Sequence, residues 1–357
     1  MHLETTFPDA RGGAARRLAL ADAFARIVDL ALQRGADVLT VGGDLYESER
    51  AGPQTFRFLA EQFARFGKPV YVAPGNHDPH APNSLLARSD LPANVRVFEE
   101  AAWRAFPLAE GVTLWGFGHT PAEPGRPFAA ARFERPGVQI ALVHGSDEQR
   151  CPPRKRATAP FTLDEIAASG TTLALAGHYH GGYIAKHARK PLLVYPGSPE
   201  PIKFGEGEAH GAALVTLEGS AHTVELIPIA RTRALDRSCD LNGVEHERAA
   251  LARIEAALEG LGTGDYVRLR LEGTPAEGSR VDPELVRQRF GAALGSFDVT
   301  DATRAYDYER LAREPTVRGH VVRDLLAALR PGDPDEAFAE DALRYALAAF
   351  DGADIAP

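Results

Sequence analysis

Four short polar segments of this sequence each follow directly on an apolar run that is typical of a β-strand. They are Gly43-Asp44, Gly75-Asn76-His77-Asp78, His144-Gly145 and Gly177-His178-Tyr179-His180. Their carboxylate, amide and imidazole groups are ligands suited to Mn, Fe or Zn. The two histidines of the last segment, two residues apart on one loop, can point at neighbouring metal ions. The pattern predicts a metal centre built from His, Asp and Asn.

Such a centre requires strands that end at a common edge. The spacing of apolar residues predicts a helix over 14–35, a short buried strand over 36–41, a second helix over 53–66 and another strand over 69–73. Polar residues stand just past each strand end. This alternation indicates an α/β sheet with its site at the carboxyl ends of its strands.

Beyond residue 90 the pattern changes to closely spaced short strands, which indicates a layered and mostly β region. A helix is predicted over 162–169, and strands are predicted over 95–98, 112–117, 138–143, 173–176, 192–195, 213–217 and 224–229. The strand pattern stops between 230 and 242, and we place a domain boundary at residue 232. The elements expected after it are helices over 245–261, 283–290 and 335–350 and a strand over 266–271.

The composition of the chain excludes several classes of protein. The chain has 357 residues, of which 44% are hydrophobic and 25% charged, so disorder, collagen and coiled coil are excluded for the chain as a whole. A formal charge of −9 gives no general attraction to nucleic acid, although a local basic patch could supply it. Neither a membrane span nor a secretory signal is readable, so we expect a cytoplasmic protein without membrane attachment. Two distant cysteines give no disulfide framework.

The four segments together resemble the motifs of the calcineurin-like metallophosphoesterases. That superfamily places Asp-x-His, Gly-Asp, Gly-Asn-His-Asp, a lone His and Gly-His-x-His on successive strand ends around two metal ions. The order and spacing agree over residues 2–180. The resemblance implies an α/β fold, a layered sandwich of two mixed β-sheets flanked by helices over residues 1–232. It also implies a smaller α+β capping domain over 233–333, followed by a C-terminal segment over 334–357.

The resemblance also assigns roles to individual residues. Asp44 would bridge two divalent metal ions, with Mn expected first and Fe or Zn as alternatives. The remaining motif residues would complete the two sites: Asn76, His144 and His178 at one ion, and His2 and His180 at the other. His77 would instead contact the scissile phosphate or protonate the leaving oxygen. Two cations about 3.5 to 4 Å apart activate a shared water and hold the attacking and leaving oxygens in line, so hydrolysis of a phosphate ester is expected.

The first motif departs from the family pattern. The chain begins Met1-His2-Leu3, so the Asp of Asp-x-His and its strand are absent. Glu4, which would project to the same face of a strand as His2, is a less favoured substitute. We expect a start site assigned too late, with Met1 at the middle position of Asp-x-His. A stop codon immediately upstream of Met1 would contradict this.

Two further loops resemble a narrower group, the SbcD-like (MRE-type) DNA repair exonucleases. They are Gly42-Gly43-Asp44-Leu45-Tyr46 and Tyr195-Pro196-Gly197-Ser198-Pro199 with the following Phe204-Gly205-Glu206. This resemblance implies a DNA exo- or endonuclease that works with an SMC-like coiled-coil ATPase, and a homodimer is a further assembly to test. The ATPase would dock on helices after the capping domain. There the predicted last helix places Leu343, Ala346, Leu347 and Phe350 on one face, which its own domain or a partner must cover.

A basic cluster provides local support for DNA. Arg150, Arg154, Lys155 and Arg156 follow the ligand candidate His144 and could hold backbone phosphates, or form only a solvated surface loop. Two other functions stay open at this point: a phosphodiesterase or phosphatase for a small nucleotide, and a binding protein whose metal site is impaired. About 120 residues after the catalytic domain favour the nuclease, because a small-molecule enzyme would not need them.

Overall fold

The computed structural model describes residues 1–357 except 6, 8–12, 153–155, 207–209, 277–278, 280, 329–335 and 353–357. The chain folds into two compact units. The first comprises Met1–Leu235 and Gly264–Tyr266, and the second Asp236–Thr263 and Val267–Pro357. The assignment of separate functions to residues 1–232, 233–333 and 334–357 stays a prediction.

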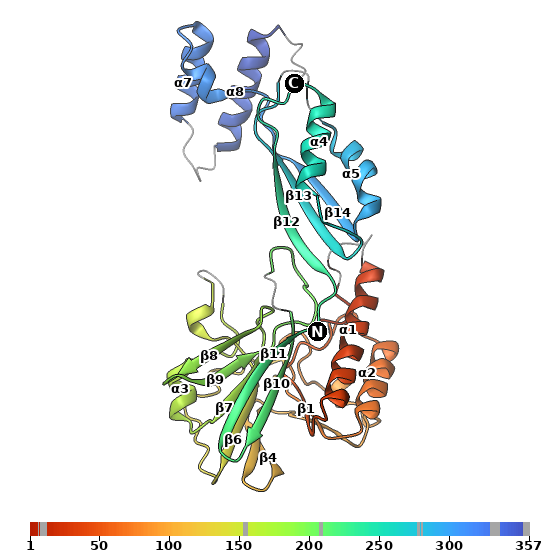
Figure 1. The fold of residues 1–357 in the computed structure, drawn as a ribbon. Helices are drawn as coiled ribbons and strands as arrows, with labels where there is room; N and C mark the ends of the chain where they lie inside the picture. The colour runs from red at the N-terminus through yellow and green to blue at the C-terminus, as the bar shows by residue number, and fades with distance from the viewer. Residues whose placement is uncertain are drawn as a thin grey trace. The chain divides into compact units, whose positions relative to one another are not determined.

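A three-stranded parallel sheet of β1 (Leu39–Val41), β2 (Val70–Val72) and β3 (Val95–Val97) lies in the first unit. Helices α1 (Gly13–Gln33) and α2 (Pro53–Phe66) lie beside it (Figure 1). Helix α2 begins with a proline at its first position and ends where Gly67 adopts a left-handed conformation, as expected for these residue types. Apolar side chains of both helices pack with those of the sheet. The elements predicted for this region are confirmed.

A six-stranded mixed sheet forms the other layer of the first unit, in the order β4-β5-β6-β7-β9-β8. Its strands are β4 (Trp103–Ala109), β5 (Val112–Phe117), β6 (Val138–His144), β7 (Leu173–Gly177), β8 (Tyr183–His187) and β9 (Lys190–Tyr195). The central strand β6 is buried at every residue and pairs in parallel with β7, with His144 opposite Gly177. That register brings the two strand ends side by side. The predicted α/β class with flanking helices is confirmed.

Short elements complete the first unit. They are the hairpin β10 (Gly211–Glu218) and β11 (Ala221–Pro228), helix α3 (Leu163–Ala168), and the 3₁₀ turns η1 (Leu85–Ala87) and η2 (Glu148–Arg150). The edge strands β4 and β8 were not predicted. Each leaves most of its residues at least partly exposed, and each carries a register irregularity, so neither shows a clean alternating pattern.

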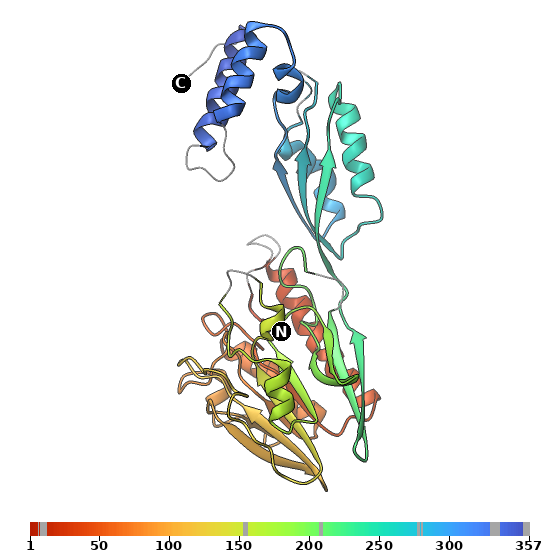
Figure 2. The ribbon, with the colours of Figure 1, turned by 90° about the vertical axis from the view of Figure 1, so that its left-hand side faces the viewer.

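The sheet of the second unit consists of β12 (Arg233–Asp240), β13 (Asp265–Glu272) and β14 (Ser296–Asp301), and Figure 2 shows it with its helices. Val267, Leu269 and Leu271 pack in one core with helices α4 (Glu247–Ala257) and α5 (Pro283–Phe290), and the turn η3 (Gly291–Ala293) follows α5. The expectation that no strand lies between 230 and 242 was wrong. Only Ala234 and Cys239 of β12 are buried, so its sequence is too polar to show a strand.

Three helices end the described chain: α6 (Tyr308–Ala312), α7 (Val317–Ala328) and α8 (Glu336–Phe350). Leu343 and Leu347 of α8 are fully buried against Leu311 and Val322, whereas Phe350 is 46% exposed. Part of the predicted docking face is therefore core of its own unit. None of the helices in the described ranges is both long and apolar enough to cross a membrane.

Truncating Leu343 tests this packing. We expect Leu343→Ala to lower the free energy of unfolding of the second unit by about 2 to 5 kcal/mol, because the substitution removes buried methyl groups and leaves a cavity. Tyr345→Ala, on the same helix at a side chain that is 40% exposed, is the matched control and should change stability far less. Urea denaturation gives both values. Equal effects of the two substitutions would show that α8 is not packed as described.

Candidate metal centre

The structure brings together all the residues proposed from the four segments. Asp44 follows β1 and Asn76 follows β2, and because these strands are parallel their carboxyl ends meet at one edge. His144 ends β6, and His178 follows β7 beside it. The N-terminal segment reaches the same place, because the backbone N–H of His2 donates to the carbonyl oxygen of Asp44 at 2.8 Å.

Asp44 lies at the middle of the cluster. Its Oδ2 is 3.6 Å from Nε2 of His2 and 3.3 Å from Nε2 of His144. Among the residues that the structure describes, two groups of side chains have ligand atoms close enough to hold an ion. Asp44 belongs to both: one adds His2 and His77, the other His144 and His178. On the first side, the ring centroids of His2 and His180 are 5.1 Å apart. On the second, Asn76 Oδ1 lies 2.9 Å from His144 Nε2. A carboxylate shared by two groups suits a dinuclear metal site.

Glycines make this close approach of loops possible. A Cβ on Gly75 would lie 2.3 Å from Oδ1 of Asp44, and one on Gly43 would lie 2.6 Å from Nδ1 of His144. Any side chain at either position would push the carboxylate and the imidazole apart. Asp44 itself has a φ of 54°, which is uncommon for a residue other than glycine and is held here by its surroundings.

The carboxylate of Asp78 is one such support. It is fully buried and accepts hydrogen bonds from the backbone N–H groups of Asp44 at 2.9 Å, Leu45 at 2.7 Å and Gly75 at 2.6 Å. It therefore joins the loop after β1 to the loop after β2. Asp78 was recognised as the last residue of its motif, but only the structure shows this bracing role.

The orientation of the imidazoles fits metal binding. Nδ1 of His144 lies 2.8 Å from the carbonyl oxygen of Gly42, Nδ1 of His2 lies 2.7 Å from Oε1 of Glu47, and Nδ1 of His180 bonds Glu206. A ring nitrogen can bond a carbonyl or carboxylate oxygen only by donating, so each Nδ1 carries a proton and Nε2 is the atom left for a metal. At His144, Nε2 also faces Oδ1 of Asn76, so there a metal ion would take the place of a proton. Metal-binding histidines are held in this way, and the donor set therefore fits two divalent ions.

The charge states agree with this fit. Burial lowers the pKa of His2 to about 4 and that of His178 to about 3, so both rings are neutral near pH 7, as ligation requires. Burial opposes ionisation of Asp44, but neighbouring His144 and His2 hold the pKa of its carboxyl well below its ordinary range. Burial lowers the pKa of His144 and the charge of Asp44 raises it, with a net rise. The raised pKa favours a proton on Nε2 of His144, and we expect metal binding to displace it.

Glu47 is a residue that the sequence did not identify. Its two carboxylate oxygens lie 2.7 Å from Nδ1 of His2 and 2.8 Å from Nδ1 of His77. Burial raises the pKa of Glu47, but these hydrogen bonds outweigh burial and lower the pKa to about 2. One ionised carboxylate thus orients a candidate ligand and the candidate catalytic histidine. The only signal in the sequence is a Glu three residues after Asp44, which is too common a residue to single out.

Substituting Glu47 tests its part in the site. We expect Glu47→Gln to weaken metal binding about 10- to 100-fold, the usual cost of losing a partner that orients a ligand, and to lower activity with it. Glu49→Gln, two residues further on at an exposed position, is the matched control. Isothermal titration with Mn²⁺ gives both affinities. If the two variants bind metal alike, Glu47 does not orient the ligands.

The basic cluster is less compact than the sequence suggested. Arg150, in η2, lies with its guanidinium carbon 3.9 Å over the ring of Tyr183. Arg156 is 82% exposed and forms an ion pair with Glu123. Arg154 and Lys155 lie outside the described residues. Of the two described members of this cluster, Arg150 is therefore the one that packs on a ring of the six-stranded sheet, that of Tyr183 in β8.

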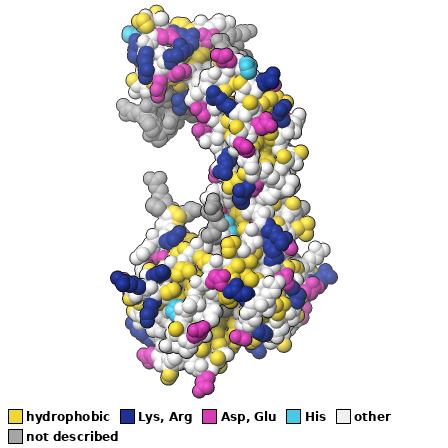
Figure 3. All heavy atoms as spheres, in the orientation of Figure 1, with side chains coloured by type: hydrophobic (Ala, Val, Ile, Leu, Met, Phe, Trp, Pro, Cys, Tyr) yellow, Lys and Arg dark blue, Asp and Glu magenta, His cyan; other side chains and the backbone are white. Residues whose placement is uncertain are grey.

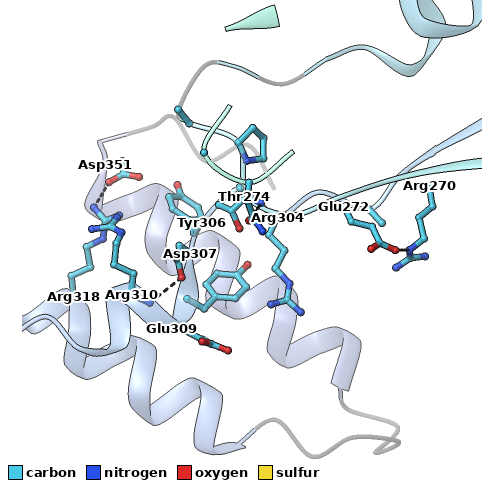
Figure 4. A pocket seen from close by; sticks show the side chains of 18 residues that line it. Arg270, Glu272, Thr274, Arg304, Tyr306, Asp307, Glu309, Arg310, Arg318 and Asp351 are labelled. Carbon is cyan, nitrogen blue, oxygen red and sulfur yellow. Dashed lines mark hydrogen bonds and ion pairs between the residues drawn. The ribbon is translucent and has the colours of Figure 1, made fainter. Parts of the chain in front are cut away.

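A separate hollow of about 910 Å³ lies in the second unit (Figure 4). The described part of its lining holds four arginines and four acidic residues, among which Arg270 pairs with Glu272 at 2.9 Å and Arg318 with Asp351 at 2.7 Å. Because positive and negative side chains are equal in number, this lining favours neither an anionic nor a cationic ligand. None of the predicted site residues within the described ranges lines this hollow.

Comparison with known proteins agrees with the geometry. Residues 19–220, more than half of the chain, match the family model described as "Calcineurin-like phosphoesterase superfamily domain". The chain is 26% identical over 285 residues to the uncharacterized metallophosphoesterase YhaO of Bacillus subtilis (strain 168), with 75% of this chain and 67% of that protein covered. Among solved structures it is similar to TT1561 of Thermus thermophilus, with a TM-score of 0.34 and 15% identity, over 49% of this chain and 83% of that one. The matched family region contains every proposed site residue except His2.

Proposed function

This chain belongs to the calcineurin-like phosphoesterase superfamily, and from that premise we propose that it hydrolyses phosphodiester bonds of DNA. Membership together with the dinuclear donor set makes it a metal-dependent phosphoesterase. The DNA substrate, the SbcD-like role in repair and manganese as the metal are our proposals. Two bound divalent ions would supply an activated water and neutralise the charge of the phosphoryl oxygens.

The side chains of the centre have distinct tasks in this proposal. Asp44 stands between the two groups of ligands and would bridge them. His77 is 44% exposed, and Glu47 occupies its Nδ1, so Nε2 is the ring atom left to contact the phosphate or to protonate the leaving oxygen. Glu47 thus fixes the tautomer of His77 as well as its orientation. These positions agree with a general acid held beside a metal centre.

The observation that supports DNA as the substrate is Arg150. It is exposed, stands six residues after the candidate ligand His144, and forms no ion pair with a carboxylate among the described residues. Its charge is therefore available for a phosphate. Elsewhere the attraction is weak. Figure 3 shows Lys and Arg side chains interspersed with Asp and Glu on the face it presents, and the net charge is −9. The contribution of Arg154, Lys155 and Arg156 stays a proposal.

A metal-dependent assay tests the function. We expect protein treated with EDTA to lose activity and to regain it with Mn²⁺, on single- or double-stranded DNA as well as on bis-p-nitrophenyl phosphate. Hydrolysis of the small diester without any cleavage of DNA would contradict the DNA proposal and favour a small-nucleotide phosphodiesterase. A metal content of one ion or none per chain, with no hydrolysis, would favour a binding protein with an impaired site.

The partners remain proposals that rest on the resemblance to SbcD-like nucleases. An SMC-like coiled-coil ATPase would have to use apolar side chains that the second unit leaves exposed. Val317 is 74% exposed and Tyr345 40%, in addition to Phe350. A homodimer and a cytoplasmic location are likewise proposals.

A further inference from the structure

A row of tyrosine rings begins at His178, a candidate ligand of the metal centre. The ring of His178, a candidate ligand, lies 5.4 Å from that of Tyr179, and Tyr179 lies 5.0 Å from Tyr195. Tyr195 in turn stacks on Tyr183, with centroids 4.8 Å apart and planes 16° from parallel. Tyr195 is fully buried, whereas Tyr179 and Tyr183 are partly exposed. The two partly exposed rings thus extend from the candidate ligand His178 toward the surface.

Hydrogen bonds fix these rings in place. The hydroxyl of Tyr179 donates to the carbonyl oxygen of Asp147 at 2.8 Å, that of Tyr183 to Oδ2 of Asp147 at 3.2 Å, and that of Tyr195 to the carbonyl oxygen of Gly145 at 2.6 Å. Asp147 is itself buried. All three hydroxyls are therefore engaged by the segment that follows His144, so the orientation of the rings is set before any ligand arrives. A fixed surface loses little conformational entropy on binding.

Arg150 lies over Tyr183, the last ring of this row. Its guanidinium carbon lies 3.9 Å from the ring centroid of Tyr183, a distance at which cation–π attraction holds the group over the ring. The side chain is exposed, and no described carboxylate pairs with it. A guanidinium is planar and weakly hydrated, so its other face can stack on a second flat group. Arg150 thereby presents a charged, flat surface at the outer end of the row of rings that starts at His178.

We propose that Arg150, with Tyr183 and Tyr179 beneath and beside it, is a subsite for an unpaired nucleobase next to the scissile phosphate. This inference rests on the proposed function and narrows it, because a base inside a duplex has both faces covered by its neighbours. The substrate class is then a single-stranded or frayed end. Aromatic and arginine platforms bind single strands in this way with little sequence preference.

A competing explanation is that Arg150 merely packs on Tyr183 and attracts phosphates by charge. Substitutions at Arg150 separate the two. Arg150→Lys keeps the charge and loses the flat surface, whereas Arg150→Ala loses both. Lys186→Ala, which removes an exposed cation from β8, is the matched control. Arg150 is exposed, so none of its variants should disturb the core.

The first measurement is binding without turnover. A short single-stranded oligonucleotide with a terminal 2-aminopurine is titrated with EDTA-treated protein, and its fluorescence reports stacking of that base. We expect quenching with the wild-type protein and the control, and about tenfold weaker binding with little quenching for Arg150→Ala and Arg150→Lys, since loss of one stacked base costs about 1 to 3 kcal/mol and each 1.4 kcal/mol is a factor of ten. Unchanged quenching in these variants, or none with the wild type, would overturn the subsite.

The second measurement compares two esters with the same leaving group, the p-nitrophenyl ester of thymidine 5′-monophosphate and methyl p-nitrophenyl phosphate. With Mn²⁺ present, the wild type should show the lower KM for the nucleoside ester, and Arg150→Ala should lose about tenfold of that preference. Equal KM values for both esters in the wild type would overturn the subsite while leaving a phosphodiesterase. Hydrolysis of neither ester, with quenching retained, would support the subsite and contradict the proposed function.

Discussion

Asp44→Asn should remove most of the bound metal and with it the hydrolysis of phosphodiesters. Asp44 contributes to both groups of candidate ligands, and its carboxylate is the negative charge that both share. An amide of the same shape has no charge and bridges two cations poorly. We expect metal affinity to fall by more than the 10- to 100-fold that follows loss of an orienting partner, and activity to fall in parallel.

Metal analysis of the purified variant by mass spectrometry, together with an assay on bis-p-nitrophenyl phosphate, measures this effect. Asp37→Asn is a suitable control, since Asp37 stands near the start of β1 with a side chain that is 96% exposed. A variant at position 44 with normal metal content and full activity would show that the bridge is assigned to the wrong residue.

The second large effect is expected at His77. If its imidazole contacts the phosphate or protonates the leaving oxygen, His77→Ala should lower kcat by about 10²- to 10⁴-fold while leaving the metal content intact. The geometry also allows the alternative role of a metal ligand, because His77 lies close enough to His2 and Asp44 to share an ion with them. Separate measurement of kcat and of bound metal distinguishes the two roles.

His187→Ala provides the comparison for this variant, because His187 is exposed at the end of β8 and belongs to neither group of candidate ligands. Loss of metal from His77→Ala would make His77 a ligand. A normal kcat with normal metal would leave it without a role in the reaction. In the first case the general acid would have to be sought elsewhere, with Glu47 still orienting both rings.

The sequence by itself determined the candidate site to a large extent. All of the proposed ligands except His2 stand at or just after the ends of strands, and a strand such as β6, buried along its whole length, has a continuous apolar run that is easy to recognise. Because parallel strands end at a common edge, residues that follow different strands meet in space. This rule groups Asp44 with Asn76 and His144 with His178. The two pairs follow strands of different sheets, so their meeting was implied by the family resemblance and is seen in the structure.

Only the tertiary structure decided which groups surround those residues. Glu47, Glu206 and Asp78 orient imidazoles or join loops, but each is an acidic residue of a kind that is frequent on any surface, and its partner is set by how the loops fold. The same holds for Arg150, whose place over Tyr183 depends on two segments brought together by the sheet.

Elements with many exposed residues could not be fully predicted from the sequence either. Strand β12 buries only two of its side chains, so neither apolar spacing nor composition marks it. For helix α8 the apolar face was visible, but its surroundings were not. Leu343 and Leu347 are buried in the core of the second unit, against the described helices α6 and α7. Phe350, further along the same face, stays exposed. An apolar stripe predicts that burial is needed, and only the packed structure shows what provides it.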